Sequence, residues 1–106
     1  MGKDSRKTAG YIALVHKDKA TSYGVSFPDV PGCISAGDTF EEAIENASQA
    51  LAGHLAIMKA DGDPIPRGRS LEQLKHDAEF IDDSSDAVIA FVMPQVDQMT
   101  ILQSAS

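Results

Sequence analysis

The stretch that decides the fold runs from Phe27 to Ala47 and reads FPDVPGCISAGDTFEEAIENA. Its pattern predicts the end of one strand, a tight turn, a short strand, a second turn and the start of a helix. Pro31 presets φ for the first turn, and Gly32 accepts the positive φ that the next turn position requires. Gly37 then ends the short strand just before the helix.

Two overlapping residue pairs can cap the start of this helix. Thr39 and Glu42 match the S/T-x-x-E capping box, in which each side chain bonds to the free backbone N–H of the other residue. Asp38 and Glu41 fit the same roles almost as well, so both registers stay open. In either register acidic groups lie in the first helical turn, where the helix dipole favours negative charge.

Further strands are predicted on both sides of this stretch. Residues 11–17 and 87–93 are apolar on both faces, which is typical of neighbouring strands buried within a sheet. Residues 22–27 alternate between apolar and polar and predict a strand with one face on the core. A short edge strand is expected at residues 33–36, and a polar hairpin loop at residues 17–21.

The strand at residues 22–27 has two unlike faces. Its core-facing residues are Tyr23, Val25 and Phe27. Gly24 and Ser26 leave the outer face bare, which allows another backbone to approach closely. Cys33 is the sole cysteine and is expected to be a small buried residue.

The main helix is predicted from Phe40 to Ala60. Apolar residues recur at the helical period and form its buried stripe, which comprises Phe40, Ile44, Ala47, Leu51, His54 or Leu55, and Met58. The DGDP run at residues 61–64 ends the helix. Ser70 and Gln73 form a second capping box, which starts a short helix that ends near residue 76.

Length and composition describe one globular domain. The chain has 106 residues, of which 42% are hydrophobic, more than a disordered chain carries. Residues 1–9 are expected to be a disordered tail and residues 95–106 a polar tail, around a domain at residues 10–94. The net charge of −7 argues against a free-standing nucleic-acid binder and suits a basic partner. With no apolar run long enough for a membrane span and no signal peptide, a cytoplasmic location is expected.

These elements predict an α+β fold in the order β-β-β-α-(short α)-β. The first three strands form an antiparallel meander, and a right-handed crossover through the long helix adds the fourth strand parallel to the first. The predicted sheet is therefore mixed, with strand order 3-2-1-4 and the long helix on one face. Ile12 and Leu14 remain on the other face, where the short helix is too small to cover them, so we expect a second subunit or a partner protein there.

The most negative segment of the chain runs from residue 77 to residue 86. Such a run usually forms a solvated loop, but it is also the candidate contact for a basic partner. The candidate residues are Asp77, Glu79, Asp82, Asp83 and Asp86. In the preceding linker, Arg67 and Arg69 either keep the loop soluble, which is the interpretation we favour, or clamp an acidic neighbour.

The order FPD-x-PGC, a short strand with GDT, and an EEA-x-x-NA helix resembles the HicB-like antitoxin family over about residues 11–93. The residues that carry the motif are Pro28, Asp29, Pro31, Gly32, Gly37, Asp38, Thr39 and Glu42. The resemblance implies a partial RNase H-like fold for residues 10–94. It also implies an antitoxin that binds and masks a HicA-type toxin, a small basic RNase that cleaves mRNA through a histidine.

The residues for an enzyme of this fold are missing. An RNase H nuclease needs carboxylates from strand one, the main helix and strand four to hold two metal ions. Neither residues 11–16 nor residues 87–93 contain an acid, and turn and capping roles explain Asp29 and Asp38. No nucleophile–base pair, phosphate-binding loop or dinucleotide fingerprint is present. We therefore expect neither an enzyme nor a metal or cofactor site.

Alternatives to a toxin-binding function stay open. One is an orphan oligomeric domain of the same fold that binds something else, and the less favoured one is a metal-dependent nuclease with a rearranged site. Many members of the family carry a C-terminal DNA-binding segment, for which residues 95–106 are too short, so we expect no direct nucleic-acid binding by this chain. The uncovered sheet face predicts a homo-oligomer, a dimer or a tetramer.

Overall fold

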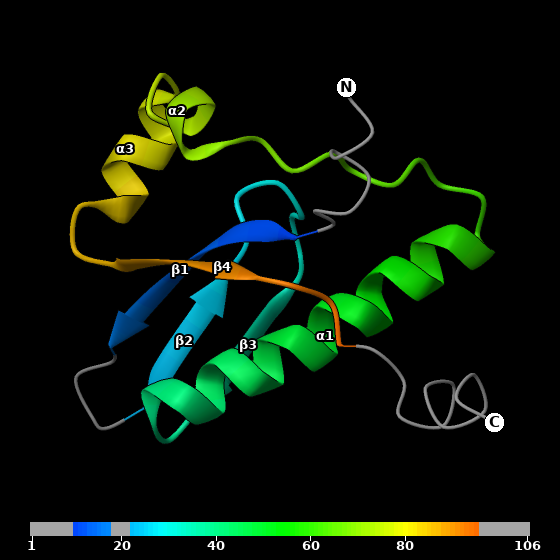
Figure 1. Ribbon diagram of the computed structural model, residues 1–106, viewed down its shortest axis with the longest axis horizontal. Coiled ribbons are helices and arrows are strands. Elements are labelled where there is room, and N and C mark those ends of the chain that lie inside the picture. The colour runs from blue at the N-terminus through cyan, green and yellow to red at the C-terminus, as the bar shows by residue number, and fades with distance from the viewer. Residues whose placement is uncertain (1–9, 18–21, 96–106) are drawn as a thin grey trace, which may run out of the picture.

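The computed structural model describes residues 10–17 and 22–95. Within them four strands form one sheet, and helices lie against it (Figure 1). The elements are β1 (Tyr11–Lys17), β2 (Tyr23–Ser26), β3 (Ile34–Gly37), α1 (Phe40–Ala60), α2 (Leu71–Leu74), α3 (Ala78–Ser84) and β4 (Val88–Val92). The expected tails and most of the expected hairpin loop lie outside the described residues, apart from Lys17 and Gln95.

The strand order is β3-β2-β1-β4, which confirms the order predicted from the sequence. The neighbours β1–β2 and β2–β3 are antiparallel, as expected for a meander. The predicted parallel direction of the fourth strand is wrong. Tyr11 pairs with Val92 and Val15 pairs with Val88, so β4 runs antiparallel to β1. The sheet is therefore antiparallel throughout and not mixed.

The direction of β4 follows from the long segment that leads to it. α1 begins beside the end of β3 and runs along the sheet, so a parallel β4 would have to begin where α1 ends (Figure 1). Residues 61–87 instead carry the chain back across the sheet, and β4 begins beside the end of β1. The Tyr11 hydroxyl holds this return segment by donating a hydrogen bond to the Pro66 carbonyl (2.6 Å).

Thr39 is the N-cap of α1, in agreement with one of the two predicted registers. Its hydroxyl accepts a hydrogen bond from the Glu42 N–H (3.0 Å). The Glu42 carboxylate accepts from the Asp38 N–H (2.8 Å), one residue earlier than in a standard capping box. The predicted helix end is confirmed, with Asp61 as the C-cap and Gly62 in the left-handed region at φ 79°.

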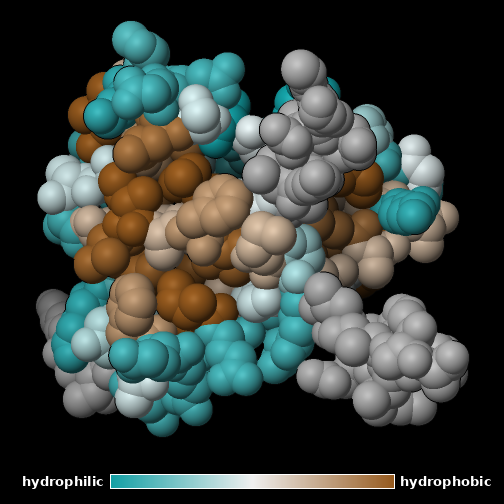
Figure 2. Space-filling model, in the orientation of Figure 1, coloured by the Kyte–Doolittle hydropathy of each residue, from teal (hydrophilic) through white to brown (hydrophobic). Residues whose placement is uncertain are grey.

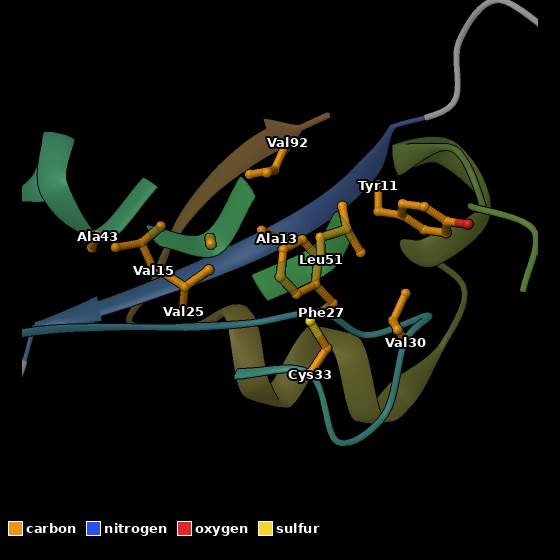
Figure 3. Close-up of a cluster of buried hydrophobic side chains, with 11 residues drawn as sticks. Tyr11, Ala13, Val15, Val25, Phe27, Val30, Cys33, Ala43, Leu51 and Val92 are labelled. Atoms are coloured by element: carbon orange, nitrogen blue, oxygen red, sulfur yellow. The ribbon is translucent and has the colours of Figure 1, made fainter. Parts of the chain in front are cut away.

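The larger part of the core lies between α1 and one face of the sheet (Figure 3). Its buried members are Tyr11, Ala13, Val15, Val25, Phe27, Val30, Cys33, Ala43, Ala47, Leu51 and Val92. The alternation predicted for β1 and β2 is confirmed by these residues. The predicted stripe of α1 is right for Ala47 and Leu51 but omits Ala43, which is completely buried. Met58, which the stripe includes, is only half-buried.

Ala43 is buried because α1 begins directly against the end of β3. A Cβ atom on Gly37 would lie 2.4 Å from the Ala43 nitrogen and 2.8 Å from the Ala43 Cα. These are backbone atoms of a helix and cannot move aside. The close approach therefore requires glycine at position 37 and a small residue at position 43.

α2 and α3 cover part of the opposite face of the sheet. Leu14 of β1 is buried there against Leu74 and Phe80, in a second and smaller cluster. The prediction of a solvated loop at residues 77–86 is wrong, because α3 occupies most of this segment and contributes Phe80 to the smaller cluster. The expectation of an uncovered Leu14 is therefore wrong as well, although much of this face stays open.

A clamp of Asp29, Arg69 and Asp77 holds the return segment and α3 in place. The nearly buried Asp29 carboxylate accepts hydrogen bonds from the Arg69 N–H (2.6 Å) and the Arg69 Nε (2.7 Å). Arg69 Nη1 donates to Asp77 Oδ2 (3.1 Å), and Asp77 Oδ1 caps α3 by accepting from the Glu79 N–H (2.9 Å). Of the two roles considered for Arg69, the structure shows the clamp.

The clamp joins one arginine to two carboxylates. The hydrogen bond from Arg69 holds the pKa of Asp77 below the ordinary range, and the hydrogen bond from the Glu79 N–H lowers this pKa further. The hydrogen bonds to Asp29 and Asp77 in turn raise the pKa of Arg69. Both bonds of the arginine side chain are therefore charge-assisted, which makes them stronger than neutral hydrogen bonds.

Replacing Gly37 by Ala is expected to destabilise the fold by about 1–3 kcal/mol, because the new methyl group overlaps the backbone of α1. The matched control is Gly53→Ala within α1, where a Cβ atom has no described neighbour within 4 Å. There alanine should stabilise the helix by about 1 kcal/mol. Urea denaturation followed by circular dichroism measures both, and shifts of the same sign would contradict the close approach.

Replacing Asp77 by Asn should lower stability at neutral pH but not in acid. The folded-state pKa of Asp77 lies below the unfolded value of about 3.9, so its charge stabilises the fold above about pH 4, and this effect is lost as the pH falls through the folded pKa. Asparagine keeps the capping ability. The urea midpoint of Asp77→Asn should be lower than that of wild type at pH 7, and the two midpoints should converge in acid. The midpoint of the control Asp82→Asn should match that of wild type at both pH values. A neutral-pH midpoint unchanged in Asp77→Asn would refute the clamp.

Candidate functional site

A groove crosses the open face of the sheet above β2. Gly24 and Ser26 form its floor, which is as bare as the sequence predicts, since a Cβ atom on Gly24 would have no described neighbour within 4 Å. α3 lines one side of the groove through Phe80 and Asp83, and β3 lines the other through Ile34. We call this feature, with these residues, the acidic groove.

The acidic groove consists of three hollows that share lining residues. The first, of about 340 Å³, lies beside α3 and includes Ser26, Ile34 and Asp83. The second, of about 280 Å³, shares Ser26 and Ile34 with the first and reaches His16 and Gly24. The third, of about 320 Å³, shares His16 and Gly24 with the second. The hollows therefore form one continuous path along β2.

The two walls of the groove differ in chemistry. On the β3 side, Ile34 is 70% exposed and lies near Pro31. On the α3 side, Glu79 and Asp83 are four residues apart, so they lie one above the other on the helix. Asp77 lies at the start of the same helix, as its N-cap. The groove thus places an apolar contact opposite a row of carboxylates.

Contacts at both ends of α3 fix the acidic wall. At the start of the helix Asp77 belongs to the clamp. At the other end His16 Nε2 donates to the Asp83 carbonyl (3.0 Å) and lies 3.6 Å from the Asp86 carboxylate. Between them Phe80 is buried against β1. The carboxylates of α3 therefore occupy a set position above the floor.

The acidic residues that the sequence nominates lie in different environments. Glu79 and Asp83 line the groove. Asp77 also lines it, but its carboxylate is engaged in the clamp. Asp82 is exposed and lines none of the three hollows, and Asp86 is exposed beside the end of β1. The structure therefore brings three of the five candidates to the groove, and two of these carboxylates lie outside the clamp.

The motif residues divide between the groove and the helix start. Those at the groove are Pro28, Pro31 and Gly32, and those at the start of α1 are Gly37, Asp38, Thr39 and Glu42. Asp29 lies between the two sets and belongs to the clamp. The Cys33 N–H closes the turn by donating to the Val30 carbonyl (3.1 Å), with φ 89° at Gly32, as the Pro-Gly pattern predicts.

A second exposed surface is the apolar edge of the sheet at β4. The prediction that this strand is buried is wrong, because β4 is an edge strand in which Val88, Ile89 and Phe91 are 54%, 41% and 56% exposed. Figure 2 shows hydrophobic side chains gathered across the face where β4 lies in Figure 1. Residues 87–93 contain no charge, so nothing in the strand opposes pairing with another strand.

The described residues offer few groups for catalysis. They contain no group of three or more side chains that could hold a metal ion. Asp29 is engaged by Arg69, and Asp38 lies at the start of α1. Burial raises the pKa of the Cys33 thiol, so this cysteine is not an activated nucleophile. No helix within the described ranges is long and apolar enough to cross a membrane.

Sequence reasoning missed one residue of the site and the partner of another. Ile34 is part of a predicted strand, but only the sheet order shows that it borders an open face. Arg69 was considered for a clamp without a named partner, and that partner, Asp29, lies 40 positions away. The available signal was the combination of an acidic residue in a predicted turn with an arginine next to a capping box.

Comparisons with known proteins agree with the motif. Residues 11–105 match a family model described as the HicB_like antitoxin of bacterial toxin-antitoxin system. The crystal structure of the N-terminal domain of Burkholderia pseudomallei antitoxin HicB is 34% identical with a TM-score of 0.66, over 83% of this chain and 98% of that chain. A chain of the HicA3 and HicB3 toxin-antitoxin complex is 26% identical with a TM-score of 0.63, again over 83% and 98%.

A curated relative shows how much of a longer protein this chain resembles. A 14.9 kDa uncharacterized protein from the rep-hol intergenic region of Haemophilus phage HP1 is 45% identical over 60 residues. These residues are 57% of this chain and 45% of the phage protein, so the chain spans about half the length of that relative. The family that matches is one of antitoxins and not of enzymes, as expected from the missing carboxylates. From the turn and cap motif, the four-stranded sheet and the match over residues 11–105, the chain belongs to the HicB-like antitoxin family of bacterial toxin–antitoxin systems.

Proposed function

We propose that this chain binds and neutralises a small basic RNase toxin of the HicA type by covering its RNA-binding surface. The observation that carries the proposal is the family match over residues 11–105. One similar chain of known structure comes from a HicA3 and HicB3 toxin-antitoxin complex, which supports the same kind of partner. Because such a toxin cleaves mRNA, the antitoxin would act in the cytoplasm.

Masking requires a surface that finds a basic partner and then holds it. The net charge of −7 attracts a basic protein and speeds the encounter. Exposed apolar side chains such as Ile34 then supply area that slows dissociation. The same negative charge repels phosphates, so we expect no direct binding of operator DNA by these 106 residues.

Co-expression with the neighbouring gene tests the proposal. A small basic product of that gene should stop growth when expressed alone, and this chain should restore growth and co-purify with it. A toxin variant without its catalytic histidine should be harmless and should still co-purify, which separates binding from RNA cleavage. A neighbouring product that is neither toxic nor bound would contradict the proposal and favour the orphan oligomeric domain.

We also propose that two copies of the chain associate through β4. The outer edge of β4 is unpaired within the described residues, and two such edges can pair antiparallel about a two-fold axis. This pairing would join the two sheets and cover Val88, Ile89 and Phe91, which are about half exposed in the single chain. A dimer is the smallest assembly that this arrangement produces, and a tetramer would need a further surface.

Replacing Val88 by Lys should convert the dimer into a monomer, because a charged side chain on an edge strand opposes strand pairing. The control is Ile57→Lys, which puts the same charge at a similarly exposed apolar position on α1. Light scattering after size exclusion at micromolar concentration distinguishes the two masses. A monomeric wild type, or a dimer that survives Val88→Lys, would show that β4 is not the interface.

A further inference from the structure

We propose that the acidic groove is the surface on which the toxin binds, and that it receives a segment with a cationic side chain next to an apolar one. The cation, from Lys or Arg, lies against Glu79 and Asp83 of α3, and the apolar side chain packs on Ile34 of β3. This inference rests on the proposed function and assigns a location and a ligand chemistry to it.

The shape of the groove favours a segment that runs along β2. The floor at Gly24 and Ser26 carries almost no side chain, so the backbone of a partner can come close to the strand. Ile34 pairs with Ser26 in the sheet and stands exposed directly beside this floor. A segment over β2 therefore covers Ile34 and places its neighbouring side chain in the hollow of about 340 Å³ beside α3.

The charges of the groove determine which side chain goes where. In residues 10–17 and 22–95 neither Glu79 nor Asp83 is in an ion pair, whereas Asp77 is already held by the clamp. Two carboxylates one helical turn apart can share one guanidinium or ammonium group. At the far end of the groove Lys17 lies 4.8 Å from the ring of Tyr23. The cation of the partner therefore belongs at the α3 end.

The acidic wall needs no rearrangement before binding. The clamp fixes the start of α3, and the His16 hydrogen bond to the Asp83 carbonyl fixes its end. Only the carboxylate side chains of Glu79 and Asp83 lose freedom when a cation binds. A preorganised wall reduces the entropy lost on association, which favours tight binding to a small surface.

A basic toxin suits the groove better than the two other occupants. A second copy of this chain has a net charge of −7 and would bring further carboxylates toward Glu79 and Asp83, and the uncharged edge at β4 suits it better. The other competitor is the basic segment of this chain itself, with Lys3, Arg6 and Lys7. Both competitors can be distinguished from the toxin by experiment.

The experiment measures binding rates of the full chain to the neighbouring gene product without its catalytic histidine, by biolayer interferometry at low and physiological salt. The groove variant is Glu79→Gln with Asp83→Asn. The control variant is Asp82→Asn with Glu45→Gln, which removes the same two charges from exposed positions outside the groove. A third variant, Ile34→Ala, removes the apolar contact. Circular dichroism verifies that each variant is folded.

We expect the groove variant to associate about tenfold more slowly and with a weaker salt dependence, and the control variant to change less than about twofold. Ile34→Ala should dissociate about tenfold faster with little change in association. Equal effects of the two charge variants, or unchanged dissociation of Ile34→Ala, would overturn the groove as the binding surface. A wild-type chain that does not bind the product at all would instead refute the proposed function.

The same variants test the other occupants. If the groove variant loses self-association but binds the toxin as the wild type does, the groove is assigned to a second copy of the chain. A second pattern would assign the groove to the basic segment of the chain. In that pattern the wild type binds the toxin weakly, deletion of residues 1–8 tightens this binding, and the groove variant leaves it unchanged. Either result overturns the proposal, and toxin binding that is independent of residues 1–8 supports it.

Discussion

The contact between the Asp29 carboxylate and Arg69 is the interaction on which the second half of this structure depends. The Asp29 side chain is only 9% exposed, and its carboxylate accepts hydrogen bonds from both the backbone and the side chain of Arg69. A carboxylate this far from water needs its partner, so the end of the return segment is tied to the turn after β2. Arg69 then reaches Asp77, which caps α3. The position of α3, the start of β4 and the acidic wall all follow from this chain of contacts.

The two faces of the sheet are covered in different ways, and this difference creates the binding surface. On one face α1 lies so close to β3 that only Gly37 and Ala43 fit at the contact, and the core there is closed. On the other face, short helices held by charged groups cover Leu14 and leave β2 open. A fold that needs few bulky residues above β2 can therefore keep a groove there without losing its core.

The acidic residues of α3 carry out separate tasks that their sequence does not distinguish. Asp77 caps α3 and accepts a hydrogen bond from Arg69, and both contacts lower its pKa. Glu79 and Asp83 line the groove, whereas Asp82 is exposed and lines none of its hollows. The apolar edge at β4 lies elsewhere on the molecule and carries no charge. Self-association and binding of a basic partner can thus use different surfaces, one dominated by apolar area and one by charge.

The sequence by itself determined the turn before β3, the ends of α1 to within one residue, and the order of the strands. The turn at Pro31 and Gly32, the cap at Thr39 and the capping box at Ser70 each depend on residues within a few positions. Their signals are therefore readable in the chain, although the pattern alone placed the cap of α1 at either Asp38 or Thr39. Strand order was also predictable, because two strands that are apolar on both faces tend to be neighbours.

Only the tertiary structure decided the direction of β4, the formation of α3 and the partner of Arg69. An acidic run has the same sequence pattern whether it forms a loop or an exposed helix. It becomes a helix here because Phe80 packs on β1 and because Asp77, which caps the helix, is held by Arg69. The clamp joins residues 40 positions apart, and no local pattern encodes such a distance. The groove depends on both, since it exists only where α3, β2 and β3 meet in space.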